Sequence, residues 1–368
     1  METPNKYNSL YIMISPTVRC NLSCRYCYVE QNMSLKESDM TLDDIKYIYQ
    51  WVREYSDLVG IKKIRLEWFG GEPFVVGGDF LEKAIDCQYE YFSTEEFQIH
   101  NSIQTNLVLA NRPENVNLIK KRFNNYISGS FDYKGDARIF KNGKDSTPIV
   151  IDNIKYLQNK GISVGLVCTL TKSNIKYIDE MYNFFKDIGV DFRVNRAAHV
   201  EDLIAQSSVI TTQEYSDAVI RLFDLYTNDE NCDIGFENFD MMARLYLMGL
   251  SDICVTVTKP YLHLAFEANG RLFSRCRFVP QIGNYHNETP KNILEKLKSI
   301  STERVAPQAC SSCQFFNKTC MGGCFGERNK DCFNSDCGYR GETNKEIWAY
   351  IERILTSQGY KYGEYRKS

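Results

Sequence analysis

The sequence has no long hydrophobic run, no large excess of either charge and no Pro-rich linker. Nothing approaches the length of apolar sequence that a membrane-spanning helix needs, and Met1–Tyr7 lacks the basic start and apolar run of a signal peptide. The formal net charge of −3 gives no broad attraction to nucleic acid or to an anionic membrane surface. We therefore expect a cytoplasmic protein that binds neither nucleic acid nor membrane.

Cysteine, by contrast, is plentiful and grouped. The 14 cysteines form one group from Cys20 to Cys27 and a second from Cys254 to Cys337, with isolated residues at Cys87, Cys168 and Cys232. A reducing compartment argues against a disulfide framework, and clustered thiols there indicate metal binding. The four histidines show no dyad or metal-ligand spacing, which leaves cysteine as the candidate ligand.

The first group, Cys20, Cys24 and Cys27, has the spacing CxxxCxxC. Thiolates are the usual protein ligands of a 4Fe–4S cluster, and three of them can hold three irons. The local stretch supplies no fourth cysteine, so one iron would stay open for a small molecule. Zinc normally takes four ligands with CxxC pairs as the common unit, and it fits this spacing poorly.

Short apolar runs alternate with amphipathic segments between residues 10 and 197, which predicts an α/β fold. The predicted strands are Leu10–Ser15, Ile61–Phe69, Phe97–Thr105, Tyr126–Phe131, Ser163–Thr169 and Asp191–Asn195. The predicted helices are Leu42–Arg53 after a Thr41 N-cap, Phe80–Tyr91, Ile149–Gln158 and Ile175–Phe185. This alternation indicates a parallel sheet, either doubly wound or a partial TIM-like barrel, and both build active sites at C-terminal strand ends.

The cysteine triad, with the aromatic Tyr26 before its last member, resembles the radical S-adenosylmethionine (SAM) superfamily. The resemblance implies an α/β fold with a partial (β/α)6 TIM-like barrel, and a 4Fe–4S cluster on Cys20, Cys24 and Cys27 that binds SAM at its open iron. An electron from the cluster would cleave SAM to methionine and a 5′-deoxyadenosyl radical. That radical would abstract a hydrogen atom from the substrate.

Further motifs match those with which this superfamily binds SAM. Gly70-Gly71-Glu72-Pro73 resembles the GGE-type motif that contacts the SAM amino group, and glycines let the backbone approach a ligand closely. Strand four ends in a Ser-x-Asp element, and a nearby arginine matches the one for the methionine carboxylate, which suits a planar guanidinium. The resemblance thus assigns cofactor binding to Gly70, Gly71, Glu72, Ser130, Asp132, Arg138 and Asn195.

The second cysteine group contains a hairpin-like stretch, Phe266–Phe273, with Asn269-Gly270 as its turn. The spacing Cys310-x2-Cys313-x6-Cys320-x3-Cys324, followed by Cys332 and Cys337, resembles a C-terminal SPASM domain with two auxiliary 4Fe–4S clusters. The competing interpretation is a structural zinc site on Cys310, Cys313, Cys320 and Cys324.

The SPASM resemblance also implies the ligands of each auxiliary cluster. The cluster nearer the active site would take Cys254, Cys276 and Cys324, with an open iron, Cys332 or a non-cysteine ligand such as His263 in the fourth place. The outer cluster would take Cys310, Cys313 and Cys320, with Cys337 or Cys332 as its fourth ligand.

We expect four parts along the chain. These are a radical SAM barrel at 1–230, a helical bridge at 231–250, a SPASM domain at 251–340, and a terminal helix with a loose tail at 341–368. The resemblance implies an oxidoreductase that modifies a ribosomally made precursor peptide by oxidation, crosslinking or epimerisation. An electron donor such as flavodoxin or ferredoxin would serve it. Because the first strand begins at Leu10, leader recognition would come from a separate protein or from the core itself.

Other functions stay open at this point. Anaerobic sulfatase maturases make formylglycine, but they carry an aspartate just after the cysteine that matches Cys276, where this chain has Arg277. A carbohydrate dehydrogenase or epimerase and a zinc-binding interaction protein are further alternatives. Glu237, Asp240, His263 and Arg277 are all possible catalytic residues, and none stands out.

Overall fold

The computed structural model describes residues 9–27, 29, 39–197, 208–249, 259–274, 281–302, 310–320 and 344–365. The cysteines at 254, 276, 324, 332 and 337, and Arg277, lie outside these residues. The strands of the described part are β1 (Leu10–Ser15), β2 (Lys63–Trp68), β3 (Gln98–Thr105), β4 (Tyr126–Ser130), β5 (Ser163–Leu170), β6 (Asp191–Arg196), β7 (His263–Glu267), β8 (Arg271–Phe273) and β9 (Gln281–Asn284). The α-helices are α1 (Leu42–Val59), α2 (Gly78–Asp86), α3 (Pro113–Arg122), α4 (Thr147–Asn159), α5 (Ile178–Asp187), α6 (Thr212–Thr227), α7 (Glu237–Leu247), α8 (Pro290–Thr302) and α9 (Lys345–Ser357).

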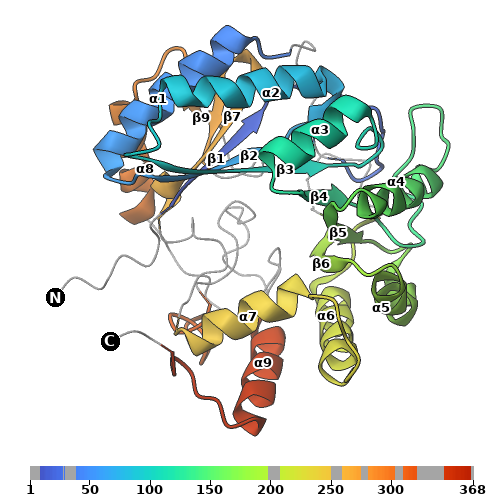
Figure 1. Cartoon of the computed structure of the whole chain (residues 1–368). Helices are drawn as coiled ribbons and strands as arrows, with labels where there is room; N and C mark the ends of the chain where they lie inside the picture. Colours follow the sequence, from blue (N-terminus) through green and yellow to red (C-terminus); the bar gives the residue numbers. More distant parts are fainter. Residues whose placement is uncertain are drawn as a thin grey trace.

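The strands form one sheet in the order β6-β5-β4-β3-β2-β1-β7-β8-β9. Strands β1 to β6 are parallel and follow the chain order without a switch point, with helices α1 to α5 along the outer side of the curved sheet (Figure 1). A doubly wound sheet would reverse its order at one strand and carry helices on both faces. The predicted partial barrel is therefore confirmed.

Local sequence signals account for where several helices begin and end. Thr41 caps α1 through a reciprocal capping box with Asp44, and Gly60 ends the helix in the left-handed conformation (φ 73°). Helix α3 was not predicted from the sequence, although Pro113 stands at its first position, which is typical of a helix start.

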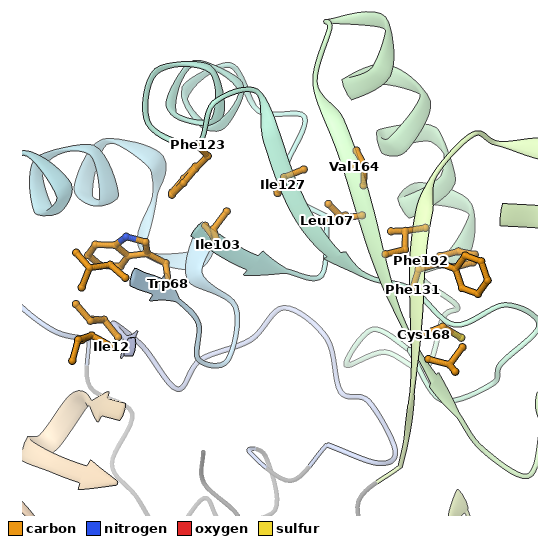
Figure 2. Close-up of a cluster of buried hydrophobic side chains, with 14 of the residues drawn as sticks. Ile12, Trp68, Ile103, Leu107, Phe123, Ile127, Phe131, Val164, Cys168 and Phe192 are labelled. Atoms are coloured by element: carbon orange, nitrogen blue, oxygen red, sulfur yellow. The ribbon is translucent and has the colours of Figure 1, made fainter. Parts of the chain in front are cut away.

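The core lies between the barrel strands and the outer helices. Alternate strand residues such as Ile12, Trp68, Ile127 and Phe192 point to this side and are almost completely buried (Figure 2). Because strand side chains alternate between the two faces, the residues between them point to the inner face of the barrel. The sequence alternation therefore fixes which side chains can reach a bound molecule.

The sheet continues beyond the six predicted strands. β7 pairs in parallel with β1, from Tyr11 opposite His263 to Ser15 opposite Glu267. β7 and β8 form the predicted antiparallel hairpin, with Asn269 (φ 70°) at its turn. The hairpin thus extends the barrel sheet directly from the strand that leads into the first cysteine group.

The C-terminal segment packs back onto the preceding helices. Tyr350 of α9 donates its hydroxyl hydrogen to Asp224 at 2.6 Å. The backbone N–H groups of Gly363 and Tyr365 donate to the carbonyls of Tyr246 and Leu247, both at 2.9 Å. The expectation of a loose tail is therefore wrong for residues 359–365. In the described part of the chain, no helix is long and apolar enough to cross a membrane.

Candidate functional site

The first cysteine group lies in the loop after β1, at the C-terminal edge of the sheet. On one side, the N–H groups of Gly71 and Glu72 donate to the carbonyls of Thr17 (3.0 Å) and Arg19 (2.9 Å). On the other, the N–H groups of Ser23 and Arg25 donate to carbonyls of the segment after β4, at 2.7 and 2.9 Å. The loop is therefore held between the β2 and β4 ends of the barrel.

The three thiols of this loop share one electrostatic environment. Burial, together with the neighbouring Cys27, raises the pKa of Cys20 to about 11 and that of Cys24 to about 12. Arg138 acts in the opposite direction on both thiols. Among the described residues, no group of three His, Cys, Asp or Glu side chains is placed to hold a single metal ion. A 4Fe–4S cluster makes a different demand, since it takes one thiolate per iron.

Tyr26 connects the cysteine loop to the end of β4. Its hydroxyl donates to Asp132 Oδ2 at 2.6 Å and accepts from Arg138 Nη1 at 2.8 Å. Asp132 Oδ1 also accepts the backbone N–H of Thr169 at the end of β5, at 2.9 Å. Burial raises the pKa of Asp132, while Arg138 and these hydrogen bonds oppose that rise. Tyr26 thus brings together Asp132 and Arg138, two residues that the sequence predicted to bind SAM.

The Gly-Gly-Glu segment lies against the cysteine loop, and its carboxylate is already engaged. Glu72 is 1% exposed and accepts hydrogen bonds from Thr105 Oγ1 (2.6 Å), Asn106 N (2.7 Å) and Phe74 N (3.1 Å). A Cβ on Gly71 would overlap the carbonyl oxygen of Arg19. Glu72 therefore joins this segment to β3, and Gly71 permits its close approach to the loop.

Asn106, which the sequence analysis did not select, lies directly beside Cys20. Its Nδ2 is 3.6 Å from Cys20 Sγ and donates to Asn21 Oδ1 at 2.7 Å. Its own Oδ1 accepts the N–H of Val108 at 3.0 Å, which fixes the orientation of the amide. The sequence signal that could have identified Asn106 is its position directly after the predicted strand Phe97–Thr105.

Ser130 and Asn195 lie on the inner face of the barrel. Ser130 Oγ accepts from Gln104 Nε2 at 2.9 Å, and Gln104 Oε1 accepts from Ser128 at 2.6 Å. Asn195 lies on β6 opposite Thr169 of β5. These residues line the barrel next to Asp132, with Gln104 as a second residue that sequence reasoning missed.

Comparison with known proteins identifies this arrangement. Residues 14–185, from the end of β1 into α5, match the family model of the radical SAM superfamily. They form a radical SAM domain. The serine-type anaerobic sulfatase-maturating enzyme of Bacteroides thetaiotaomicron is 24% identical over 348 residues, which are 86% of this chain and 82% of that enzyme.

Solved structures share the fold over most of the chain. Native anSMEcpe, solved with bound AdoMet and a Kp18Cys peptide, superposes with a TM-score of 0.75 at 20% identity, over 95% of this chain and 98% of that one. Streptococcus suis SuiB bound to the precursor peptide SuiA gives a TM-score of 0.60 at 17% identity, over 88% and 76%. These likenesses support the radical SAM fold.

The described residues fit the cofactors of the radical SAM superfamily, a 4Fe–4S cluster and SAM. The loop offers three half-buried thiols with no disulfide partner. Two buried nitrogens near them, Asn21 Nδ2 and Arg138 Nε, have no hydrogen-bond partner in the described part of the chain. Since buried polar groups are normally hydrogen-bonded, both are free to donate to a bound group.

Three described cysteines of the second group lie in one short turn segment, 310–320. Cys313 N donates to the carbonyl of Cys310 at 3.1 Å, and Cys320 N to that of Phe315 at 2.9 Å. Of the candidate catalytic residues, Glu237 and Asp240 lie on α7 and His263 lies on β7. Glu237 pairs with Arg193 (3.4 Å), Asp240 accepts from Tyr226 (3.1 Å), and His263 packs on the Tyr11 ring (4.3 Å between centroids).

Proposed function

We propose that this protein is a radical SAM enzyme that modifies a peptide, with Cys20, Cys24 and Cys27 as the ligands of the SAM-binding cluster. The observation that carries the proposal is the hydrogen-bond network of Tyr26, Asp132 and Arg138. This network joins the loop with the CxxxCxxC motif to the inner side of the barrel. When bound, cluster and SAM supply a 5′-deoxyadenosyl radical for hydrogen abstraction. Arg138 would bind the SAM carboxylate and the Gly70–Glu72 backbone its amino group. Ser130 would reach the SAM ribose or carboxylate, and Asn195 would border the adenosine part.

The fold likeness to two proteins solved with peptides supports a peptide as substrate. The precursor would be ribosomally made, and its product oxidised, crosslinked or epimerised. The partner set includes an electron donor such as flavodoxin or ferredoxin, and a separate protein or the core itself would recognise the leader. We further propose a cytoplasmic location.

The remaining assignments follow from the SPASM resemblance. One auxiliary cluster would be held by Cys254, Cys276 and Cys324, and a second by Cys310, Cys313 and Cys320. Cys332 or Cys337 would supply a fourth ligand. The proposed parts are the barrel at 1–230, the bridge at 231–250, the SPASM domain at 251–340 and the terminal segment at 341–368.

Formylglycine formation in a sulfatase is the second candidate, because the relative from Bacteroides thetaiotaomicron is a sulfatase-maturating enzyme matched over 86% of this chain. The experiment that tests both uses the anaerobically reconstituted, dithionite-reduced protein with SAM. 5′-Deoxyadenosine formation tests the radical SAM activity. A peptide mass lower by two hydrogen atoms, for a sulfatase-derived serine peptide, supports the sulfatase function. An altered mass only in a precursor peptide, or one deuterium gained by that peptide when the reaction is run in D2O, supports the first proposal. No 5′-deoxyadenosine contradicts both.

A further inference from the structure

The inner face of the barrel is polar, and one of its carboxylates differs from the others. Glu67 of β2 lies between Met13 of β1 and Ser102 of β3 in the sheet register, so its side chain points to the same face as theirs. Its neighbours in the strand, Leu66 and Trp68, are fully buried on the outer side. Glu67 therefore faces the space that the barrel strands enclose.

The Glu67 carboxylate has no hydrogen bond or ion pair with any described residue. Two other carboxylates of the site are fully engaged: Glu72 accepts three hydrogen bonds, and Asp132 accepts two. Burial raises the pKa of Glu67, because the charged carboxylate loses part of its hydration on the inner face of the barrel. A bound ligand that brings a donor would compensate for this loss.

The charges around Glu67 decide what kind of donor fits. Arg193 of β6 attracts it without forming an ion pair, and Arg193 itself contacts Glu237 at 3.4 Å. Glu237 in turn repels Glu67. Arg65, two residues earlier on the same face, places its guanidinium over the Tyr11 ring. Arg65 is not among the groups that act on Glu67, so the charges at this point are the two carboxylates of Glu67 and Glu237 and the one guanidinium of Arg193. This excess of negative charge favours a cationic ligand group.

We infer that Glu67 is a specificity-determining residue that binds a basic side chain, lysine or arginine, of the peptide substrate inside the barrel. This inference rests on the proposed peptide-modifying function and names the chemistry of its substrate. A carboxylate paired with an ammonium or guanidinium group forms a charge-assisted hydrogen bond, about twice as strong as a neutral one. Basic peptides would thus be selected over neutral peptides of the same shape.

The test uses an equimolar mixture of acetylated, amidated peptides of one length, identical except for Lys, Arg, Gln, Leu or Glu at one central position. Immobilised, reconstituted protein with SAM captures peptides anaerobically, and mass spectrometry quantifies those retained. We expect the wild type to retain the Lys and Arg peptides about tenfold over the Gln peptide, the size of one charge-assisted hydrogen bond. Glu67→Gln should abolish this preference, Glu67→Lys should shift it to the Glu peptide, and Glu67→Asp should keep part of it.

Glu54→Gln on the exposed side of α1 is the matched control and should retain peptides as the wild type does. Iron content of each variant reports correct folding. The ratio of Lys peptide to Gln peptide retained by the wild type tests the inference independently of the variants. Equal retention of all peptides by the wild type would overturn the role of Glu67 while leaving peptide binding intact. Retention of no peptide above a blank resin would contradict the peptide function itself, and this inference with it.

Discussion

Arg138 and Tyr26, 112 positions apart in the sequence, form a hydrogen bond of 2.8 Å from guanidinium to hydroxyl. Tyr26 in turn donates to Asp132, so the residue between two cluster-ligand candidates holds both charged groups of the proposed SAM site. Burial alone lowers the pKa of Arg138, but its neighbours Tyr26, Cys24 and Asp132 outweigh this effect and raise it. The cysteine loop and the proposed SAM-binding side chains are therefore one connected structure.

Tyr26→Phe should weaken SAM binding while the cysteines keep their iron. The change removes one hydroxyl that contacts two charged groups, and a hydrogen bond to a charged group contributes about 1.5–3 kcal/mol, so we expect a Kd at least about tenfold higher. Equilibrium dialysis with SAM on the reconstituted protein measures it, with Tyr133→Phe as the control, because the Tyr133 ring packs on Phe184 outside this network. Unchanged SAM affinity in Tyr26→Phe would show that the network is not part of the SAM site.

Asn106→Ala should make the cluster on Cys20 harder to reduce. The Asn106 amide donates toward Cys20 Sγ at 3.6 Å, and a donor to a ligand sulfur stabilises the more negative, reduced state. A hydrogen bond of about 1 kcal/mol corresponds to a potential lower by roughly 40 mV. A redox titration followed by electron paramagnetic resonance measures the shift. Asn101→Ala, whose amide donates to Gln88, should leave the potential unchanged; a higher potential in Asn106→Ala would contradict the account.

Gly71→Ala should destabilise the protein by about 1–3 kcal/mol, the usual cost of an overpacked buried position. The new Cβ would overlap the Arg19 carbonyl and push the Gly-Gly-Glu segment away from the cysteine loop. Urea denaturation of the apoprotein gives the stability, and iron content gives the effect on the loop. At Gly235 a Cβ would meet only side-chain atoms, those of Asp191 at 3.3 Å and Asp240 at 3.6 Å, so Gly235→Ala serves as the control. Equal losses in both variants would argue against a specific contact at Gly71.

Apoprotein alkylation should show that Cys20 and Cys24 are protonated at neutral pH. Burial raises their pKa values to about 11 and about 12, and only the thiolate reacts with iodoacetamide. Their labelling rates, followed by peptide mass spectrometry, should therefore rise about tenfold per pH unit from 7 to 10. N-Acetylcysteine, with an ordinary thiol pKa, should level off above about pH 9. Fast labelling at pH 7 that does not increase further would contradict this prediction.

Much of the barrel could be predicted from the sequence because its strands are short apolar runs between clear turn signals. The strand at Leu10–Ser15 and the Thr41 cap are found where they were expected. The pairing of β7 with β1 could not be predicted, because about 250 residues separate the partners and no local pattern records it. The roles of Asn106 and Gln104 were missed for a similar reason, since an amide shows its partner only once the fold has formed.

The central claim is that Cys20, Cys24 and Cys27 hold the cluster that cleaves SAM. Iron and sulfide are measured after anaerobic reconstitution of the wild type and of the triple Cys20→Ala, Cys24→Ala, Cys27→Ala variant, together with 5′-deoxyadenosine formed on reduction. The account predicts about twelve irons in the wild type, about four fewer in the variant, and 5′-deoxyadenosine only from the wild type. Zinc without iron in both proteins, or equal iron and equal 5′-deoxyadenosine, would contradict it.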